Sequence, residues 1–373
     1  MIYDVMIIQY DNHNEELALI IDKLKPKKLV IILENKKDNI DIYKEVFNKY
    51  KVEKYYISND FKLLEDIIKK YLKFNTIILL NGGKRLVALQ MLDIATRYNT
   101  NSVYMDVVSQ KRYVFGKNKR TINKQLEDLY IDYIAKLSGI EIVKVANDIC
   151  ENEEIISLTK EIMNNLSMWQ KYKNKLYDNK IFIHDSKDIN HIRVNKKELN
   201  DNEIKLLDKI INYLSNRNII KHESNQSEYI VSFLNQYIKR FIFKSGTWLE
   251  IITYLTIKEI DLIDEVKCSV EFLWKESNSK IRNELDVVAV KNSILICISC
   301  KDSNKYDEDA LNELEVYSKV MGGNNVIKIL VATREPIKES VKQRAKEMNI
   351  HLVILENSIS NFKEDLVRII NSI

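Results

Sequence analysis

The chain has little proline and glycine, with two prolines and seven glycines among 373 residues. Collagen-like repeats, flexible linkers and low-complexity segments need far more of both residues, so these classes are excluded. What remains is 45% hydrophobic and 30% charged, a mixture typical of globular proteins with a sizeable core. At this length we expect two or three compact units.

Cysteines and long apolar runs are also scarce. The four cysteines are too few for a disulfide framework, which favours a reducing cytoplasm as the location. No apolar run approaches the roughly 20 residues that span a bilayer, so no membrane association is expected. The opening "MIYDVMIIQYDNHNEE" has no basic region before its apolar residues, so we interpret it as a first strand and not as a signal peptide.

The charge is unevenly distributed along the chain. From Phe241 onward there are 18 basic and 21 acidic residues, against 40 basic and 33 acidic residues before it. The C-terminal part is therefore the acidic one. A divalent cation bound there would offset local repulsion before a phosphate group approached.

Residues 1–147 alternate strand-like and helix-like stretches. Apolar strands such as "YDVMIIQY", "KKLVIILE" and "TIILL" are separated by helical stretches such as "DFKLLEDIIKKYLK" and "RLVALQMLDIATRY". Nearly continuous apolar strands separated by helices indicate a parallel sheet covered on both faces. We therefore predict an α/β, Rossmann-like domain whose ligand lies beyond the carboxyl ends of the strands.

The character of the chain changes twice after this domain. Residues 148–240 predict a helical connector, with "ISLTKEIMNNLSMWQKYKNKL", "DNEIKLLDKIINYLSNRNII" and "SEYIVSFLNQYIKRFIF" as its main stretches. Over residues 241–373 strands return, among them "DEVKCSVEFLW", "ELDVVAVKN" and "SILICISCK". The sequence therefore predicts three units with these boundaries.

The stretch "NELDVVAVKNSILICISCK" combines two carboxylates with a lysine that ends an apolar strand. Alternate residues of a strand share a face, so we expect Glu284 and Asp286 to point the same way, as do Ser299 and Lys301. The turn "VKNS" makes the strands hairpin neighbours. Carboxylate oxygens suit Mg²⁺ or Mn²⁺, and a nearby lysine positions an attacking water and offsets charge on a phosphorane-like transition state. Glu250, in the helix "GTWLEIITYLTI", offers a third carboxylate.

Other interpretations of these residues stay open. The acids and the lysine also suit the solvated edge of a surface hairpin, and Glu250 suits a semi-polar helix face with Thr253 and Tyr254. A zinc or redox role for "CISC" is disfavoured because Cys297 and Cys300 fall on opposite faces of a strand, whereas such a site needs a turn or a helix start.

The layout of a helix acid, an aspartate on one strand and a lysine on the next resembles that of PD-(D/E)xK nucleases. The wording "WLE … NELDVV … ISCK" followed by "VYSKVMGG" resembles the nuclease domain of CRISPR-associated effectors that carry a CARF sensor domain. This resemblance implies an endonuclease in which Lys301 is the catalytic lysine. It also implies that Asp286 and Glu250 bind the metal and that Glu284 supports it.

One position departs from this nuclease pattern. Ser299 stands where the family usually has Glu or Gln, and a neutral hydroxyl is a poorer metal ligand. The resemblance then requires Glu250 or Glu284 to supply the missing charge, with the backbone carbonyl of Cys300 as a further ligand.

A second candidate site lies in "TIILLNGGKRLVALQ", between a strand and a helix. Its residues are Asn81, Gly82, Gly83, Lys84 and Arg85. Glycines let the backbone approach a ligand, and a helix N-terminus offers free N–H groups to a phosphate. A glycine pair is also common in a plain strand-to-helix turn, but the two basic residues favour an anion site.

This stretch resembles the "TGGTK" element of CARF domains, with Asn81 and Lys84 replacing the threonines and Arg85 in the lysine's place. The opening "IIQYDNHNEELALIIDKLKPKKLVIIL" and the later "VYMDVVSQKRYVF" are CARF-like as well. The resemblance implies a cyclic oligoadenylate ligand bound across a two-fold dimer axis, where a pair of identical sites matches a ring with an even number of nucleotides. It also implies that the loop after the first strand lines the ligand floor, with the residues Tyr10, Asp11, Asn12, His13 and Asn14.

Together these features predict a cytoplasmic homodimer of type III CRISPR antiviral defence. In this interpretation cyclic tetraadenylate binds the CARF pair, the helical connector passes on the change, and the nuclease domains cleave DNA or RNA with Mn²⁺ or Mg²⁺. The main rival is a CARF-type transcriptional regulator that reads DNA through a winged-helix section, a role that needs neither the paired acids nor Lys301. A repair or restriction nuclease of the same fold would lack the glycine-rich half.

Overall fold

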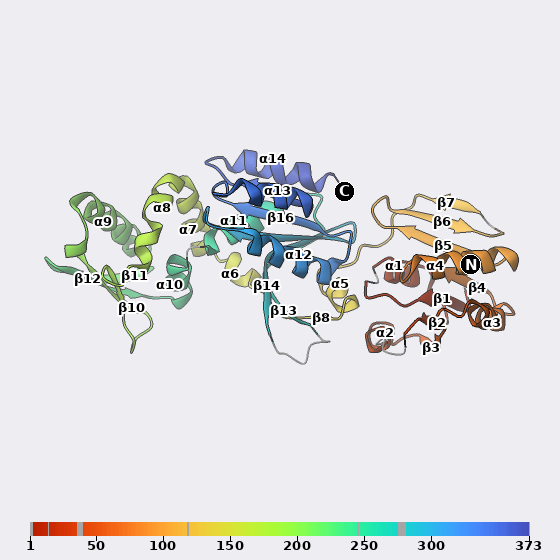
Figure 1. Cartoon of the computed structure of the whole chain (residues 1–373). Coiled ribbons are helices and arrows are strands. Elements are labelled where there is room, and N and C mark those ends of the chain that lie inside the picture. The colour runs from red at the N-terminus through yellow and green to blue at the C-terminus, as the bar shows by residue number, and fades with distance from the viewer. Residues whose placement is uncertain are drawn as a thin grey trace.

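The computed structural model describes residues 3–13, 15–35, 40–117, 119–244, 246–274 and 281–372. Three bodies lie in a row, with an N-terminal sheet at one end, the C-terminal sheet in the centre and the section after residue 150 at the other end (Figure 1). None of the helices within these ranges is long and apolar enough to span a membrane.

The N-terminal body is a seven-stranded sheet with the order β3-β2-β1-β4-β5-β6-β7. The first five strands are parallel, and β6 and β7 are antiparallel additions at one edge. The strands are β1 (Val5–Gln9), β2 (Lys28–Leu33), β3 (Lys51–Tyr56), β4 (Thr76–Leu79), β5 (Asn101–Asp106), β6 (Lys111–Phe115) and β7 (Arg120–Ile122). The helices are α1 (Glu15–Leu24), α2 (Asp41–Val46), α3 (Phe61–Tyr71) and α4 (Arg85–Arg97), and α5 (Ile131–Leu137), which comes next in the chain, lies between α2 and the central body (Figure 1). The predicted Rossmann-like arrangement is thus present.

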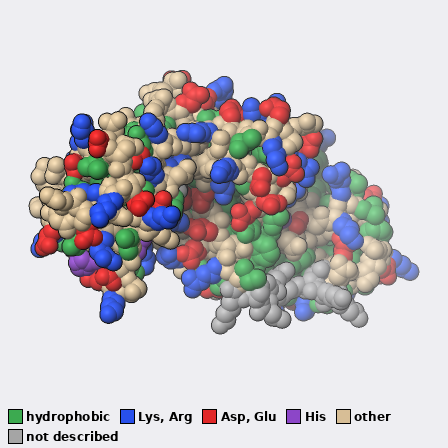
Figure 2. Space-filling view, turned by 60° about the vertical axis from the view of Figure 1, so that its left-hand side comes forward, with side chains coloured by type: hydrophobic (Ala, Val, Ile, Leu, Met, Phe, Trp, Pro, Cys, Tyr) green, Lys and Arg blue, Asp and Glu red, His purple; other side chains and the backbone are tan. Residues whose placement is uncertain are grey.

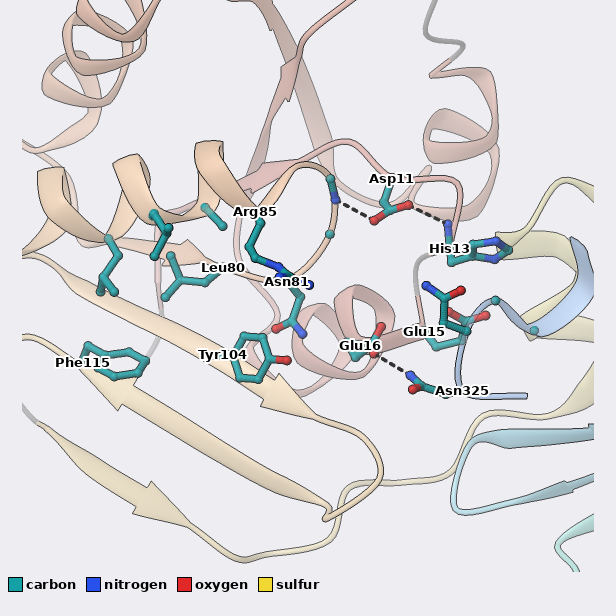
Figure 3. Close-up of a pocket in the computed structure, with 18 residues that line it drawn as sticks. Asp11, His13, Glu15, Glu16, Leu80, Asn81, Arg85, Tyr104, Phe115 and Asn325 are labelled. Carbon is teal, nitrogen blue, oxygen red and sulfur yellow. Dashed lines mark hydrogen bonds between the residues drawn. The ribbon is translucent and has the colours of Figure 1, made fainter. Parts of the chain in front are cut away.

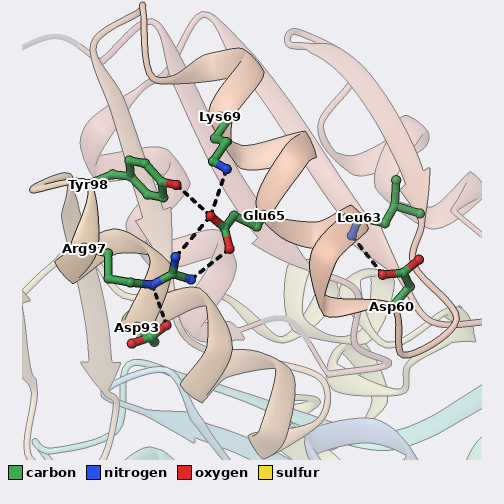
Figure 4. Close-up of polar contacts among 7 residues, drawn as sticks. All are labelled: Asp60, Leu63, Glu65, Lys69, Asp93, Arg97 and Tyr98. Atoms are coloured by element: carbon green, nitrogen blue, oxygen red, sulfur yellow. Dashed lines mark hydrogen bonds and ion pairs between the residues drawn. The ribbon is translucent and has the colours of Figure 1, made fainter.

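Two helices of this body are tied together on its outer surface. Glu65 of α3 accepts two hydrogen bonds of 3.0 Å from the guanidinium of Arg97 at the end of α4, and bonds from Tyr98 and Lys69 (Figure 4). A forked guanidinium–carboxylate pair fixes geometry in two directions. The network therefore holds α4, whose first residue belongs to the predicted ligand turn.

The central body is a six-stranded sheet with the order β17-β16-β15-β14-β13-β8. Its strands are β8 (Ile140–Lys144), β13 (Glu265–Trp274), β14 (Asn283–Lys291), β15 (Ile294–Lys301), β16 (Ile327–Ala332) and β17 (Ile350–Ile354). Its helices are α11 (Thr247–Lys258), α12 (Glu308–Gly322), α13 (Glu339–Glu347) and α14 (Ile359–Ile370). The edge strand β8 comes from residues before 148 and pairs with β13, so this sheet takes strands from both sides of the third body.

Two apolar cores divide at the central sheet. One face of the sheet packs with α12. The core on this face continues into the N-terminal sheet and includes Cys297. The other face packs with α11 and α14 in a core that continues into the third body, and includes Cys300. The two cysteines therefore lie on opposite faces of β15, as strand alternation predicts.

The third body, predicted to be helical, also contains a four-stranded antiparallel sheet with the order β11-β12-β10-β9. Its elements are α6 (Asn147–Cys150), α7 (Glu153–Asn164), α8 (Leu166–Tyr172), the 3₁₀ helices η1 (Lys173–Tyr177) and η2 (Lys196–Glu198), β9 (Phe182–His184), β10 (His191–Asn195), α9 (Asp201–Asn216), β11 (Ile220–Ser224), β12 (Glu228–Phe233) and α10 (Gln236–Phe243). The helical interpretation of "SEYIVSF" was wrong because Tyr229, Val231 and Phe233 alternate as buried residues with half-buried ones, the period of a strand.

The position of the third body also changes the expected relay. A connector would lie between the N-terminal and central bodies, but the third body lies beyond the central one (Figure 1). The N-terminal body contacts the central body directly, for example through Gln110 Nε2, which donates to the carbonyl oxygen of Asn292 at 3.0 Å. Asn325 Nδ2 of the central body likewise donates to the Glu16 carboxylate of α1 at 3.3 Å.

Candidate functional site

The candidate nuclease site lies where β14 and β15 separate. The pairing of this predicted hairpin begins at Lys291 and Ile294 and ends at Val287 and Ile298. Beyond that point Asp286 turns its carboxylate toward β15 and accepts the backbone N–H of Cys300 at 2.6 Å. Ser299 Oγ donates to the same carboxylate oxygen at 3.3 Å. Asp286 is thus held by the residues that precede Lys301.

Strand alternation reverses at this point. Leu285 packs in the core shared with the N-terminal body, whereas Val287, two residues on, packs in the other core. The neighbouring strand β13 reverses with it: Val270 packs in the core shared with the N-terminal body and Cys268 in the other core. Ser269 between them has a φ of +50°. The face shared by Glu284 and Asp286 therefore cannot be taken from strict alternation.

The charged residues of the prediction meet at this break. Burial, together with the charge of Asp286 and to a smaller extent Glu284, raises the pKa of Glu250 to about 7, while Lys301 acts in the opposite direction. Burial also raises the pKa of Asp286. Glu250 lies in the first turn of α11 with only 8% of its surface exposed. The structure thus brings Glu250, Glu284, Asp286 and Lys301 within mutual electrostatic range.

The donor set at this break fits a hard divalent cation. Glu250 is buried and Asp286 half-buried, and two such carboxylates that repel each other are stabilised when a cation takes the place of a proton. Oxygen is the ligand that Mg²⁺ and Mn²⁺ prefer. Glu284 is engaged by a hydrogen bond from Ser269 Oγ. Across the described ranges, no three Asp, Glu, His or Cys side chains are already arranged to hold a metal ion. A bound cation would therefore draw further ligands from backbone, water or substrate oxygens.

Sequence reasoning missed two charged residues beside this site. Lys244, which follows α10, acts on the pKa of Glu250 and so lies near it. Asp302, directly after Lys301, is buried at 8% exposure and collects hydrogen bonds from several elements. A carboxylate after a strand-ending lysine is a signal that the sequence did contain.

A second site is a cavity of about 470 Å³ beyond the carboxyl ends of β1 and β4 (Figure 3). Asp11, His13, Gly82, Gly83 and Arg85 are among its lining residues, so the structure brings the two predicted segments together. Asp11 links them directly, because its carboxylate accepts the backbone N–H of Gly83 at 2.6 Å.

Glycine is required at the second position of this turn. Gly83 has a φ of +62°, and a Cβ there would lie 2.1 Å from the Gln9 side chain. A side chain at this position would strain the backbone and would have to displace the Gln9 side chain, which β1 carries. The close approach of the turn to the strand therefore depends on the absence of a Cβ.

The other predicted ligand residues have different places. Asn81 lines the cavity, but its amide is used to bind the backbone of Met105 with two bonds of 2.7 Å. Lys84 forms an ion pair with Glu34 and is not among the lining residues. Tyr10 donates to Asn12 at 3.0 Å, and neither of these lines the cavity. Asn14 lies outside the described residues.

The cavity also contains residues that the sequence did not predict. Glu15 and Glu16 of α1 and Tyr104 of β5 line it, and burial raises the pKa of Glu15 to about 8. The central body closes one side with residues 322–325, where Asn325 Nδ2 donates to Glu16 at 3.3 Å. A Cβ on Gly323, whose φ is +64°, would lie 3.0 Å from the imidazole of His13. The "MGGNN" stretch after a long helix was the available signal.

Residues 235–371 match the family model described as "Card1-like, endonuclease domain". The match covers the central sheet apart from β8, and all of the predicted nuclease residues. No curated protein matches the sequence of this chain.

Solved structures match the chain over nearly its whole length. Protein VC1899 from Vibrio cholerae has a TM-score of 0.74 at 17% identity, covering 98% of this chain and 97% of that one. Can2 from Sulfobacillus thermosulfidooxidans, solved in complex with cyclic tetra-adenylate, has a TM-score of 0.73 at 16% identity, covering 99% and 100%. A type III CRISPR defence DNA nuclease activated by cyclic oligoadenylate has a TM-score of 0.54 at 12% identity, with 96% of this chain but 49% of that one covered. At these identities the likeness shows the fold, and the family model adds the enzyme class: the chain carries a Card1-like endonuclease domain on the fold of VC1899 and Can2.

Proposed function

We propose that the chain is a metal-dependent endonuclease of type III CRISPR defence that is switched on by cyclic tetraadenylate. The observation that carries this proposal is the cavity of the N-terminal body, because the endonuclease domain itself supplies one of its walls. A ligand in that cavity touches both bodies at once. The activator chemistry is supported by Can2, which shares the fold and whose structure contains cyclic tetra-adenylate.

The cavity has the features that an oligonucleotide ring needs. The N-terminus of α4 lies at its edge, and Arg85 in the first turn of that helix adds a cation. Both favour a phosphate group. Buried Glu15, with its pKa near 8, can remain protonated beside an anion and offer a hydrogen-bond donor to a nucleobase.

A homodimer would complete the cavity. Leu86 and Leu89, one turn apart on α4, are 55% and 58% exposed. Tyr104 in the next strand, β5, and Val108 just after it are 44% and 49% exposed. Leu89 and Tyr104 also line the cavity. Apolar side chains beside an open ligand site favour a protein partner, and a second copy would place two identical half-sites around one ring.

The helix α12 offers a direct link between ligand and nuclease site. It begins a few residues after Lys301 and ends at the glycines that line the cavity. Its 15 residues span about 22 Å at ~1.5 Å per residue. A ligand that binds better when residues 322–325 are displaced would shift α12 and the strand end before it; equal binding to both arrangements would shift nothing.

At the nuclease site, Asp286 and Glu250 would hold Mg²⁺ or Mn²⁺, with Glu284 next to them. A cation bound there would supply Lewis-acid stabilisation of the phosphate and lower the pKa of a bound water. Lys301 carries an ammonium beside these carboxylates, where it offsets the extra negative charge of the transition state. Ser299 and the Cys300 backbone orient the Asp286 carboxylate.

The outer face at the junction of the central and third bodies is suited to a charged substrate. Acidic side chains gather in the hollow between these bodies, with basic side chains around it (Figure 2). Acidic groups in a hollow attract metal ions, and basic groups at its rim attract a phosphate backbone.

The proposal is tested with labelled single- and double-stranded DNA and RNA, each incubated with Mn²⁺ and one cyclic oligoadenylate at a time. We expect cleavage only when cyclic tetraadenylate and the metal are both present. Equal cleavage without any activator would refute the sensor role. If none of the four substrates is cut under any condition, the nuclease role is refuted. Light scattering of the wild type and of Leu89→Asp tests the dimer, which the aspartate should weaken.

A further inference from the structure

The carboxylate of Asp302 is saturated with hydrogen bonds although it lies outside the predicted site. Its side chain is 1% exposed, and Lys173 Nζ approaches Oδ1 at 2.6 Å. Gln170 Nε2 donates to Oδ1 at 2.6 Å and Thr333 Oγ1 donates to it at 2.9 Å. The indole N–H groups of Trp248 and Trp169 donate to Oδ2 at 2.7 and 2.9 Å.

These donors come from three parts of the fold that meet at the nuclease site. Trp248 lies in the first turn of α11, two residues before Glu250. Thr333 follows β16, and its backbone N–H donates to the carbonyl oxygen of Lys301 at 3.3 Å. Trp169, Gln170 and Lys173 belong to the third body, in α8 and at the start of η1. One carboxylate therefore connects the strand of Lys301, the helix of Glu250 and the third body.

The charge of Asp302 is retained by these partners. Burial alone would raise the pKa of this carboxyl group, but the bonds from Lys173, Trp169 and Trp248 hold the pKa below its ordinary value. An ionised group in such surroundings stays in place only while its donors stay in place. Because Asp302 is covalently next to Lys301, its position restricts where the Lys301 backbone can lie.

We infer that Asp302 is a positioning residue of the nuclease site, held by Lys173 and Trp169 so that the third body sets the alignment of Lys301 with Glu250. In this role the third body is part of the catalytic apparatus and not a relay from the ligand cavity. The inference rests on the proposed nuclease site. Groups that orient catalytic or metal-binding residues typically change activity or metal affinity by about 10- to 100-fold when they are removed.

The test compares Lys173→Met with Lys328→Met in the full chain. Both lysines are 8% exposed and paired with a carboxylate, but Lys328 pairs with Glu315 on the face of the sheet that packs with α12. Both substitutions should lower the unfolding temperature. Only Lys173→Met should lower kcat by about tenfold or more at saturating metal and activator, and raise the half-activating Mn²⁺ concentration by a similar factor, with KM for the nucleic acid nearly unchanged.

A second variant protects the test against misfolding. Trp169→Phe keeps an aromatic side chain at this position but removes the indole N–H and its hydrogen bond to Asp302, so it should change kcat and the Mn²⁺ requirement in the same direction by a smaller factor. If Lys173→Met and Trp169→Phe match Lys328→Met in kcat per folded molecule and in Mn²⁺ requirement, the positioning role is refuted. Lys301→Ala separates the two ideas: if it is inactive while these variants are normal, the proposed site stands and only the role of Asp302 fails.

Discussion

Replacing Glu250 with glutamine should make the metal-free protein more stable and at the same time inactive. Glu250 is buried beside Asp286, and these surroundings raise its pKa to about 7. The folded state therefore holds a proton on this carboxyl group more tightly than the unfolded state does. Above the pH range in which this proton is lost, folding must bury an ionised carboxylate, which a glutamine avoids.

The size of the effect follows from the two pKa values. The ordinary value is 4.5 and the folded value is about 7, and each pKa unit corresponds to about 1.4 kcal/mol. Below pH 4.5 the carboxyl group is protonated in both the folded and the unfolded state, so its burial does not destabilise the fold through ionisation. The destabilisation grows as the pH rises from 4.5 to about 7 and is constant above that. Glu250→Gln should raise the free energy of unfolding by about 3 kcal/mol at pH 8 and by less than about 1 kcal/mol at pH 5.

Urea unfolding in EDTA, at several pH values between 5 and 8, measures this difference. Glu315→Gln is the control, because Glu315 keeps a pKa below its ordinary value through Lys319 and Lys328 despite its burial, so its replacement should destabilise the protein at neutral pH. Saturating Mn²⁺ should stabilise the wild type more than Glu250→Gln. A stability difference that does not change with pH would show that Glu250 is not held in the protonated form by burial.

Three further predictions concern activity. Lys301→Ala and Asp286→Ala should each lower cleavage by about 10²-fold or more while activator binding is unchanged; near-normal turnover in both would contradict the proposed site. Cleavage should require Mn²⁺ or Mg²⁺ and should not be restored by Zn²⁺ after EDTA treatment, because the available ligands are oxygens. Arg85→Ala should raise the activator concentration for half-maximal cleavage by about two orders of magnitude, with Arg85→Lys much milder and the rate at saturation recovered; normal activator binding would reduce the glycine turn to a simple connection.

The parallel sheet and the hairpin of the nuclease site could be predicted because their signals are local. Strands β1, β2 and β4 are buried on both faces and read as unbroken apolar runs. The turn between β14 and β15 has Asn292 and Ser293 at positive φ, the conformation that a two-residue hairpin turn needs. These features depend on residues that are close together in the sequence.

The ligand cavity and the nuclease site were only half predictable, because part of each comes from distant segments. Residues 322–325 reach the cavity through tertiary packing, and Glu16, the lining residue to which Asn325 donates a hydrogen bond, lies 309 positions earlier in the chain. Lys173 reaches Asp302 from a helix in another body. No periodicity or spacing in a single sequence reports such pairs.

The reversal at Asp286 shows why the finer geometry escaped prediction. Alternation is reliable along a regular strand, but Ser269 in the neighbouring strand adopts a left-handed conformation, which is uncommon for a residue with a side chain. Serine carries no sequence signal for that conformation. The direction of the Glu284 and Asp286 side chains therefore depends on a local irregularity of the partner strand.

The membership of β8 in the central sheet limits how this protein can be recombined. A gene fragment that starts at residue 235, like the matched endonuclease domain, would leave the outer edge of the ten-residue strand β13 without its partner. An unprotected strand edge pairs readily with other chains and leads to aggregation. A separately expressed nuclease domain would therefore have to include residues 140–144, added by grafting or by circular permutation. When sensor domains are exchanged between such proteins, we expect β8 to stay with its nuclease domain and the chains to be joined before residue 140.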